Sequence, residues 1–301
     1  MNNEIPSFLY DLLSKQYSKN EIEKIIKGYS SRRYTTLRIN TLKTNVESVL
    51  KVLKDNGCTY KKVEWSETAL ILENVDELRI KELDIYKNGE IYLQSLSSML
   101  PAIILNPKPE ENILDMAAAP GSKTTQIAML TDNKALITAC EKNKIRAERL
   151  KYNIEKQEAK RINILTQDAR SLSEYFIFDK ILLDSPCSGS GTINLLDKNL
   201  EKIFTKELVE RIEKTQLELL KKAISILKPG HEMIYSTCSI LKNENEENIQ
   251  KVLKSGNIEI VPIDEKYFKI LPVLSSNLEG TITICPTELY EGFFVAKLRK
   301  K

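Results

Sequence analysis

Apolar residues recur at helical spacing over the first 30 residues of the chain and again over residues 46–53, where the pair Asn56-Gly57 predicts the end of a helix. Short apolar segments between polar residues predict strands at residues 34–40, 62–65 and 69–72. Together these elements indicate a small α+β domain over residues 1–85. A short helix is predicted to follow over residues 94–105.

From residue 112 onward, short apolar segments alternate with longer amphipathic ones. The predicted strands are residues 113–116, 135–140, 162–165, 178–183 and 233–236, and the predicted helices are residues 122–130, 142–157, 207–227 and about 244–253. This alternation is typical of an α/β fold with a doubly wound, mostly parallel sheet, which we place in a second domain of residues 86–301. Ligands of such sheets bind beyond the carboxyl ends of the strands.

The composition is that of a globular chain: 301 residues, 42% hydrophobic and 29% charged, which excludes a disordered chain or a disulfide scaffold. No apolar run reaches the roughly 18–20 residues that span a bilayer, and the first residues lack the pattern of a secretory signal, so we expect no membrane contact. Five dispersed cysteines indicate a reducing, cytoplasmic location. The single histidine, His231, argues against a metal site and against a Ser-His-Asp hydrolase.

The net charge of +3 hides an uneven distribution, because residues 1–62 carry a net +6 and residues 63–114 a net −6. A basic N-terminal region is a candidate nucleic-acid contact, with Arg32, Arg33, Lys61 and Lys62 as its proposed residues. A solvated lysine-rich surface is an equally good interpretation of the same charge.

The segment Asp115-Met-Ala-Ala-Ala-Pro-Gly-Ser-Lys-Thr124 follows a predicted strand and opens a predicted helix. Its small residues let a ligand approach the backbone, and the helix N-terminus offers free N–H groups. A phosphate-binding loop needs glycine directly before Lys-Ser/Thr, whereas Ser122 intervenes here. A tight turn without a ligand remains the other interpretation.

Acidic residues close the next two strands. Glu141 is placed to accept hydrogen bonds from ribose hydroxyls, and Asp168 either contacts the same ligand or caps a helix. The small-residue turn, Glu141 and Asp168 together fit a nucleoside cofactor, and no second phosphate-binding loop is visible in the sequence. This favours S-adenosylmethionine over NAD.

Two cysteines follow the last two parallel strands. Cys187 lies in Asp184-Ser-Pro-Cys-Ser-Gly-Ser-Gly-Thr192 and Cys238 in Tyr235-Ser-Thr-Cys-Ser239. An ionised thiol can add to an electron-poor ring. Cys58, Cys140 and Cys285 are instead expected to be buried core residues.

These three motifs, in this order and spacing, resemble the Sun/RsmB-type family of RNA (cytosine-5) methyltransferases. The similarity extends to residues 37–41 and 292–297, and so covers nearly the whole chain. Many relatives carry cysteine where this chain has Ala117, and some have a C-terminal RNA-binding extension that this chain is expected to lack. The resemblance implies a Rossmann-like class I methyltransferase domain, S-adenosylmethionine as cofactor, an RNA substrate and a monomeric enzyme.

The resemblance also implies roles for individual residues. The methionine end of the cofactor would lie against Ala117, Ala118, Ala119, Pro120, Gly121, Ser122 and Lys123. Glu141 would hold the ribose, Asp168 would approach the adenine, and Asp184 would lie between cofactor and base. Arg146 would reach the cofactor or the RNA, unless it is a solvated helix residue.

In relatives the Thr-Cys cysteine is the nucleophile and the Pro-Cys cysteine serves release, so Cys238 and Cys187 receive those roles. In DNA cytosine methyltransferases it is the Pro-Cys cysteine that acts as the nucleophile, so the sequence alone leaves the two roles open. Asp184, if it shares a proton, can hydrogen-bond N3 of the base, and Lys123 is expected to help keep the thiols ionised. Residues 243–248 are predicted to be a helix start with an asparagine cap, which is a structural role.

Three functions remain open from the sequence. The leading one is cytosine-5 methylation of ribosomal or transfer RNA. Methylation of an exocyclic amine is less consistent with Ser185-Pro186-Cys187, since those enzymes favour Asp/Asn-Pro-Pro-aromatic. A non-catalytic RNA-binding or ribosome-assembly factor would have no need for both cysteines.

Overall fold

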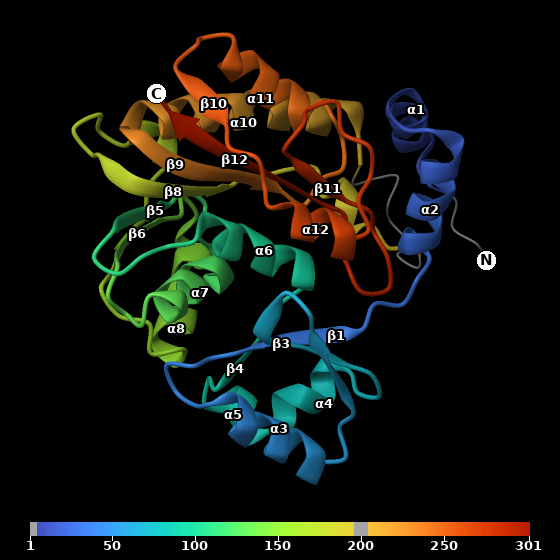
Figure 1. Ribbon diagram of the computed structural model, residues 1–301, viewed down its shortest axis with the longest axis vertical. Coiled ribbons are helices and arrows are strands. Elements are labelled where there is room, and N and C mark those ends of the chain that lie inside the picture. Colours follow the sequence, from blue (N-terminus) through green and yellow to red (C-terminus); the bar gives the residue numbers. More distant parts are fainter. Residues whose placement is uncertain (1–4, 196–203) are drawn as a thin grey trace.

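The computed structural model describes residues 5–195 and 204–301, and these form two β-sheets with helices around them (Figure 1). The smaller sheet has the strand order β2-β3-β1-β4 and the larger one the order β10-β12-β9-β8-β5-β6-β7, with β11 paired to β12. Among the described residues no helix is long and apolar enough to cross a membrane.

The smaller sheet is antiparallel throughout. Its strands are β1 (Thr35–Ile39), β2 (Tyr60–Val63), β3 (Ser66–Leu72) and β4 (Ile91–Leu93), and its helices are α3 (Val46–Asp55), α4 (Glu77–Glu82) and α5 (Asp84–Lys87). Buried side chains such as Leu37, Leu53 and Ile80 fill the space between the strands and these helices. β4 is only three residues long and was not predicted, so the sheet extends to Leu93 rather than to the predicted boundary at residue 85.

The two N-terminal helices, α1 (Ser7–Gln16) and α2 (Lys19–Tyr29), pack on the larger domain rather than on the small sheet. The Tyr17 hydroxyl donates to the Ile240 carbonyl oxygen and the Tyr29 hydroxyl to that of Ser190, both at 2.5 Å. In Figure 1 these helices lie beside the larger sheet, away from α3–α5. The helices predicted within the first 30 residues are confirmed at Ser7–Gln16 and Lys19–Tyr29, while residues 1–4 lie outside the described part of the chain. The apolar stripe of these helices does not reveal which domain they cover.

A buried arginine joins the small sheet to the larger domain. Arg38 of β1 is 1% exposed. Its Nε atom donates to Gln94 Oε1 at 3.0 Å, and one terminal nitrogen donates to Thr125 Oγ1 at 3.1 Å and to the Ser122 carbonyl oxygen at 3.3 Å. Because buried donors need partners, the Arg38 side chain fixes the small sheet against residues 122–125 of the larger domain.

The larger sheet confirms the predicted α/β fold. Its parallel strands are β5 (Asn112–Asp115), β6 (Leu136–Cys140), β7 (Ile162–Leu165), β8 (Phe178–Asp184) and β9 (Leu227–Thr237). Three antiparallel strands complete one side: β10 (Ile258–Ile260), β11 (Ile282–Ile284) and β12 (Phe293–Lys300). β10 and β11 have three residues each, too few for a periodic signal, and were not predicted.

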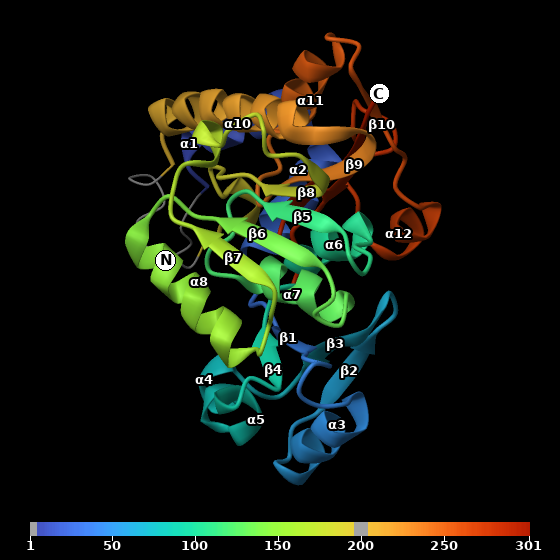
Figure 2. The same cartoon turned by 90° about the vertical axis from the view of Figure 1, so that its left-hand side faces the viewer.

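Helices cover both faces of this sheet, as Figure 2 shows. One face carries α6 (Leu96–Leu105), α7 (Ser122–Leu130) and α8 (Lys144–Lys156), and the other carries α10 (Lys206–Ile226) and α11 (Glu246–Leu253). The short helices are α12 (Glu265–Ile270), η1 (Ala169–Ser171) and η2 (Ser190–Thr192). The strand order reverses at β5, which is where a doubly wound sheet opens a crevice at its carboxyl ends.

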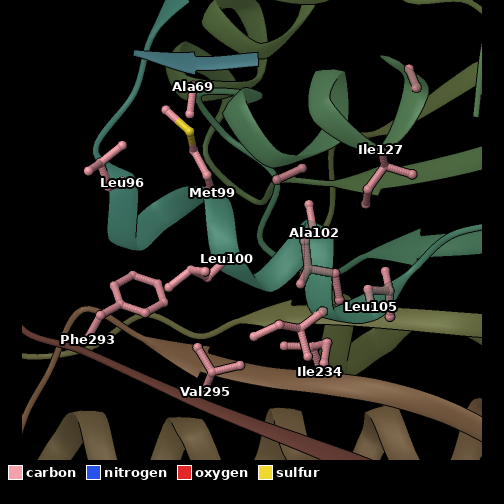
Figure 3. Packing of buried hydrophobic residues seen from close by; sticks show 14 of the residues in the cluster. Ala69, Leu96, Met99, Leu100, Ala102, Leu105, Ile127, Ile234, Phe293 and Val295 are labelled. Carbon is pink, nitrogen blue, oxygen red and sulfur yellow. The ribbon is translucent and has the colours of Figure 1, made fainter. Parts of the chain in front are cut away.

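The hydrophobic core is centred on α6, which is almost entirely buried. Figure 3 shows Leu100 and Leu105 of this helix against Ile234 of β9 and Phe293 and Val295 of β12. Ala69 of the small sheet belongs to the same cluster of buried residues. The helix therefore connects the small sheet to the strands that carry the candidate site.

Candidate active site

The strand ends line one cavity of about 240 Å³. Predicted site residues in its wall are Ala117, Ala119, Glu141, Arg146, Asp168, Asp184, Cys187 and Cys238. Residues that the prediction did not include also line it, namely Met116, Lys142, Gln167, Ala169, Arg170, Ser185, Pro186, Thr215 and Leu219. The sequence motifs that follow five different strands thus meet in one place.

Ala118, Pro120, Gly121 and Ser122 were predicted as site residues but do not line the cavity. They form the turn between β5 and α7, behind the cavity wall. Gly121 has φ +105°, and a Cβ atom there would lie 3.0 Å from Leu150 Cδ1, so glycine suits the position. The Ala118 N–H donates to the Cys140 carbonyl oxygen at 2.9 Å, which ties the turn to β6. Pro120 and Ser122 complete the connection into α7. The turn is therefore held closely between β5 and α7.

Asp115 ends β5 beneath this turn and is 1% exposed. Burial raises the pKa of its carboxyl group to about 6, although a hydrogen bond from Thr124 and the charge of Lys123 act in the opposite direction. The Thr124 Oγ1 atom donates to Asp115 Oδ2 at 2.7 Å. Asp115 belongs to the sequence motif but was assigned no role, because the burial of its carboxyl group cannot be inferred from the sequence.

Glu141 follows β6 and is 4% exposed. Its Oε1 atom accepts the Asn143 N–H at 2.9 Å, and its Oε2 atom lies 3.4 Å from the Arg146 guanidinium. Arg146 in turn donates to the Ala119 carbonyl oxygen at 2.7 Å. Arg146 therefore bridges the acidic residue and the small-residue turn, in addition to lining the cavity.

Asp168 follows β7 and caps η1, since its carboxylate accepts the Arg170 N–H at 3.0 Å. The same carboxylate pairs with the Arg170 guanidinium at 2.7 Å, and this hydrogen-bonded ion pair lowers the pKa of Asp168. Arg170 also lies 2.6 Å from Glu218 of α10. The capping role that the sequence left open is observed, and it coexists with a place in the cavity wall.

Lys123 pairs with Asp184 rather than with the thiols. Its Nζ atom lies 2.7 Å from Asp184 Oδ2 and donates to Ser98 Oγ at 2.7 Å. Burial opposes the charge of Lys123, but the interactions with Asp184, Asp115 and Cys238 together outweigh it and raise the pKa of the lysine. Asp184 also accepts the Ser236 hydroxyl at 2.8 Å. The sequence placed Lys123 near the cysteines, and the structure shows the carboxylate as its direct partner.

The Sγ atoms of Cys187 and Cys238 are 2.9 Å apart, and both cysteines are free thiols with partly exposed side chains. The hydrogen bond with Cys238 and burial raise the pKa of Cys187 well above that of an ordinary thiol. Cys58, Cys140 and Cys285 are buried, as expected. The two thiols at adjacent strand ends can therefore exchange or share a proton.

The basic N-terminal candidates separate into two kinds. Arg33 donates to the carbonyl oxygens of Thr192 and Ile193, and Lys61 lies 2.6 Å from Glu73, so these two have structural partners. Arg32 and Lys62 are exposed. Among the described residues no group of three or more His, Cys, Asp or Glu side chains is placed to hold a metal ion.

Comparison with known proteins gives two family matches. Residues 102–299 match the family described as 16S rRNA methyltransferase RsmB/F. Residues 5–77 match a ferredoxin-like domain described as RsmF/B-like. The N-terminal match includes α1 and α2 as well as most of the small sheet.

The curated relatives are ribosomal RNA small subunit methyltransferases F. The protein from Vibrio vulnificus is 36% identical over 279 residues, with 88% of this chain and 57% of the relative covered. The protein from Shewanella loihica is 33% identical over 276 residues, with 88% and 56% covered. The chain thus spans somewhat more than half the length of these relatives.

Solved structures show the same fold over the whole chain. A methyltransferase homologue from Pyrococcus horikoshii is 30% identical, with a TM-score of 0.80 over 99% of this chain and all of that one. NSun6 from the same organism, solved with SFG, has a TM-score of 0.85 at 24% identity and covers 99% of both chains.

Proposed function

The chain belongs to the RsmB/F family of 16S rRNA methyltransferases, and on that premise we propose that it transfers a methyl group from S-adenosylmethionine to carbon 5 of a cytosine in RNA. The observation that carries this proposal is the contact between Cys187 and Cys238, whose Sγ atoms lie 2.9 Å apart in the wall of the cavity. The same cavity wall includes Glu141 and Asp168, which are suited to a nucleoside.

The residues around the cavity fit S-adenosylmethionine. Ala117 and Ala119 leave room for a ligand to approach the backbone of the turn. The Glu141 carboxylate is buried at the cavity wall, where it can accept hydrogen bonds from ribose hydroxyls. Asp168 is ionised through its pair with Arg170 and can accept a hydrogen bond from the adenine amine. When bound, S-adenosylmethionine supplies an electrophilic methyl group.

We assign the roles of the two cysteines from the resemblance to the family, and the raised pKa of Cys187 supports that order. Because the pKa of Cys187 is raised, this residue keeps its proton and can donate an S–H hydrogen bond to Cys238. A thiolate at Cys238 is stabilised by that donor, and the charge of Lys123 is close enough to interact with it. Cys238 is therefore the nucleophile in our proposal, and Cys187 the residue for release.

The first step forms a bond between the Cys238 sulfur and carbon 6 of cytosine. The electron pair of the carbon 5–carbon 6 double bond moves into the ring, which makes carbon 5 nucleophilic toward the methyl group. Cys238 then no longer offers a thiolate to the S–H of Cys187. The hydrogen bond and the negative charge of Cys238, which both raise the pKa of Cys187, are then gone, and in our proposal Cys187 loses its proton to solvent at this stage.

The second step restores the aromatic ring. The Cys187 thiolate takes the proton from carbon 5, the bond between carbon 6 and the Cys238 sulfur breaks, and its electron pair returns to Cys238 as a thiolate. Both cysteines are then in the protonation states with which they began, and the net products are the methylated base, S-adenosylhomocysteine and one proton in solution. No histidine is required for this sequence.

Asp184 and Lys123 are the groups that we place against the polar edge of the base. The Asp184 carboxylate holds its Lys123 and Ser236 partners and can also accept a hydrogen bond from the cytosine 4-amino group. A proton shared between Lys123 and Asp184 would stabilise negative charge that develops at N3. The target base must be unstacked to reach this pocket.

We propose small-subunit ribosomal RNA as the substrate, since the curated relatives are named for that activity. Transfer RNA, a cytoplasmic location and a monomeric state remain predictions from the sequence. A methyltransferase for exocyclic amines would have no use for two adjacent thiols, and a binding factor without turnover would need neither.

The test is methylation of small-subunit RNA by this chain with methyl-labelled S-adenosylmethionine, followed by nucleoside mass spectrometry. The proposal expects the label in 5-methylcytidine. Label in N4-methylcytidine would instead establish the exocyclic-amine reaction, and RNA binding without label would establish a binding factor.

A further inference from the structure

A buried glutamate lies between the two cysteine loops. Glu244 is fully buried, and its carboxylate accepts four hydrogen bonds. The donors are the Ser188 N–H at 2.9 Å, the Ser188 hydroxyl, the Ser239 hydroxyl at 2.9 Å and the Gln216 amide at 3.0 Å. A buried carboxylate with this many donors is fixed in one orientation.

Three of the four donors belong to the residues that directly follow the two cysteines. Ser188 follows Cys187 and Ser239 follows Cys238. Gln216, which reaches across from α10, also donates to the carbonyl oxygen of Pro186 at 2.9 Å, on the other side of Cys187. One carboxylate thus receives hydrogen bonds next to both thiols.

The place of Glu244 is itself determined by the fold. Its own carbonyl oxygen accepts the Tyr235 hydroxyl at 2.6 Å and the Asn248 amide at 3.1 Å. The sequence predicted a helix start and an asparagine cap in this segment. The helix α11 instead begins at Glu246, and no side-chain cap hydrogen bond is present at Asn245. Glu244 is therefore free of a capping role and points its carboxylate toward the loops.

We propose that Glu244 is the positioning residue that holds the Cys187 sulfur beside Cys238, where it can take the carbon 5 proton and release the product. This inference deepens the proposed function and rests on it. The negative charge of Glu244 contributes to the raised pKa of Cys187, which keeps the S–H donor on Cys187 while Cys238 is the thiolate, before the adduct forms.

The loops do not depend on Glu244 alone for their structure. The Ser185 N–H donates to the Ser236 carbonyl oxygen at 2.8 Å, and the Gly191 N–H donates to that of Cys238 at 3.0 Å. These backbone hydrogen bonds flank the cysteines on both sides. Loss of the Glu244 contacts should therefore loosen the segment of Cys187 and Ser188, while Cys238 remains attached to β9.

The experiment compares Glu244→Gln with the full chain on RNA, with S-adenosylmethionine present. The matched control is Glu247→Gln, an exposed glutamate three residues away. Three quantities are measured: methyl transfer in the first turnover, steady-state turnover, and the fraction of RNA in a protein adduct that survives denaturing electrophoresis. A misplacement of about 1 Å can cost roughly 100-fold in rate.

For Glu244→Gln we expect the first methyl transfer to stay within about threefold of wild type while turnover falls about 10- to 100-fold and the adduct accumulates. Wild-type turnover, or an equal loss in both steps without adduct, would overturn the inference, since a merely structural role slows both steps alike. Ser188→Ala removes the hydroxyl donor and leaves Glu244 in place. If Glu244→Gln does not fold, Ser188→Ala decides by the same criterion.

Cys187→Ala, assayed in parallel, separates this inference from the proposed function. If Cys187→Ala forms the adduct and Glu244→Gln does not, the role of Glu244 is wrong and the cysteine mechanism stands. If Cys187→Ala forms no adduct, the cysteine mechanism itself fails.

Discussion

Cys187 and Cys238 follow neighbouring parallel strands and bring their Sγ atoms to 2.9 Å. The strand register explains the contact, because Asp184 of β8 pairs with Ser236 of β9 and each cysteine lies two or three residues further on. Two parallel strands therefore place two thiols over the same point at their carboxyl ends. Our proposal uses this arrangement, with one thiol as nucleophile and the other as proton donor or acceptor, and needs no histidine.

Replacement of Glu141 by alanine should weaken the binding of S-adenosylmethionine by about 1–3 kcal/mol, since ribose hydroxyls would lose a buried acceptor. Isothermal titration calorimetry measures this directly. Glu148→Ala, on an exposed position of α8, is the control and should bind like wild type. Equal affinities for a folded Glu141→Ala and the control would remove Glu141 from the binding site.

Gly191→Ala should destabilise the protein by about 3 kcal/mol, the upper part of the range for overpacked sites. A Cβ atom at Gly191 would lie 1.9 Å from the carbonyl oxygen of Gly292, so the cysteine loop would have to move away from β12. Gly57→Ala is the control, because its Cβ meets no atom within 4 Å and only the positive φ of 70° is unfavourable. Urea unfolding that shows no larger loss for Gly191→Ala than for Gly57→Ala would contradict this account.

Asp115 should make stability depend on pH between about 4 and 6. The raised pKa of about 6 means that the folded state holds a proton that the unfolded chain loses above about pH 4. The stabilising effect of the protonated carboxyl is complete at low pH and is lost as the pH rises through this window. Relative to wild type, Asp115→Asn should gain about 2 kcal/mol of unfolding free energy between pH 4 and pH 7. A difference that stays constant over this range in urea unfolding would show that Asp115 does not titrate there.

Binding of RNA should weaken with salt, because neutralised phosphates release counterions. If the N-terminal charges contact RNA, the double variant Arg32→Glu/Lys62→Glu should lower the slope of log affinity against log salt by about 1–2. Lys254→Glu/Lys269→Glu changes the same number of exposed charges elsewhere and serves as control. If the slope is identical in both double variants, the basic N-terminal region does not contact RNA and is a solvated surface.

The parallel strands and the long helices could be predicted from the sequence because their apolar periodicity extends over several residues. Helix α7 was predicted with its observed bounds of Ser122–Leu130, and the motif residues do lie beyond the strand ends. The three-residue strands β4, β10 and β11 carry no such signal, since their identity depends on pairing with distant strands.

Contacts between segments that are far apart in the chain could not be predicted. The amphipathic pattern of α1 and α2 reveals a buried face but not its partner. Lys123 was expected to act on the thiols, and its pair with Asp184 could not be predicted because it depends on how α7 and β8 meet. Glu244 was interpreted as part of a helix cap because Ser188, Gln216 and Ser239 come together around it only in the folded chain.

The cytosine-5 mechanism is tested most directly by electrophoresis of Cys187→Ala and Cys238→Ala under denaturing conditions, after incubation with RNA and S-adenosylmethionine. Cys187→Ala should still attack carbon 6 and methylate once, so it should accumulate a protein–RNA adduct. Cys238→Ala should form no adduct and transfer no methyl group. An adduct with Cys238→Ala and none with Cys187→Ala would exchange the two roles, and full activity in both variants would contradict the cytosine-5 mechanism altogether.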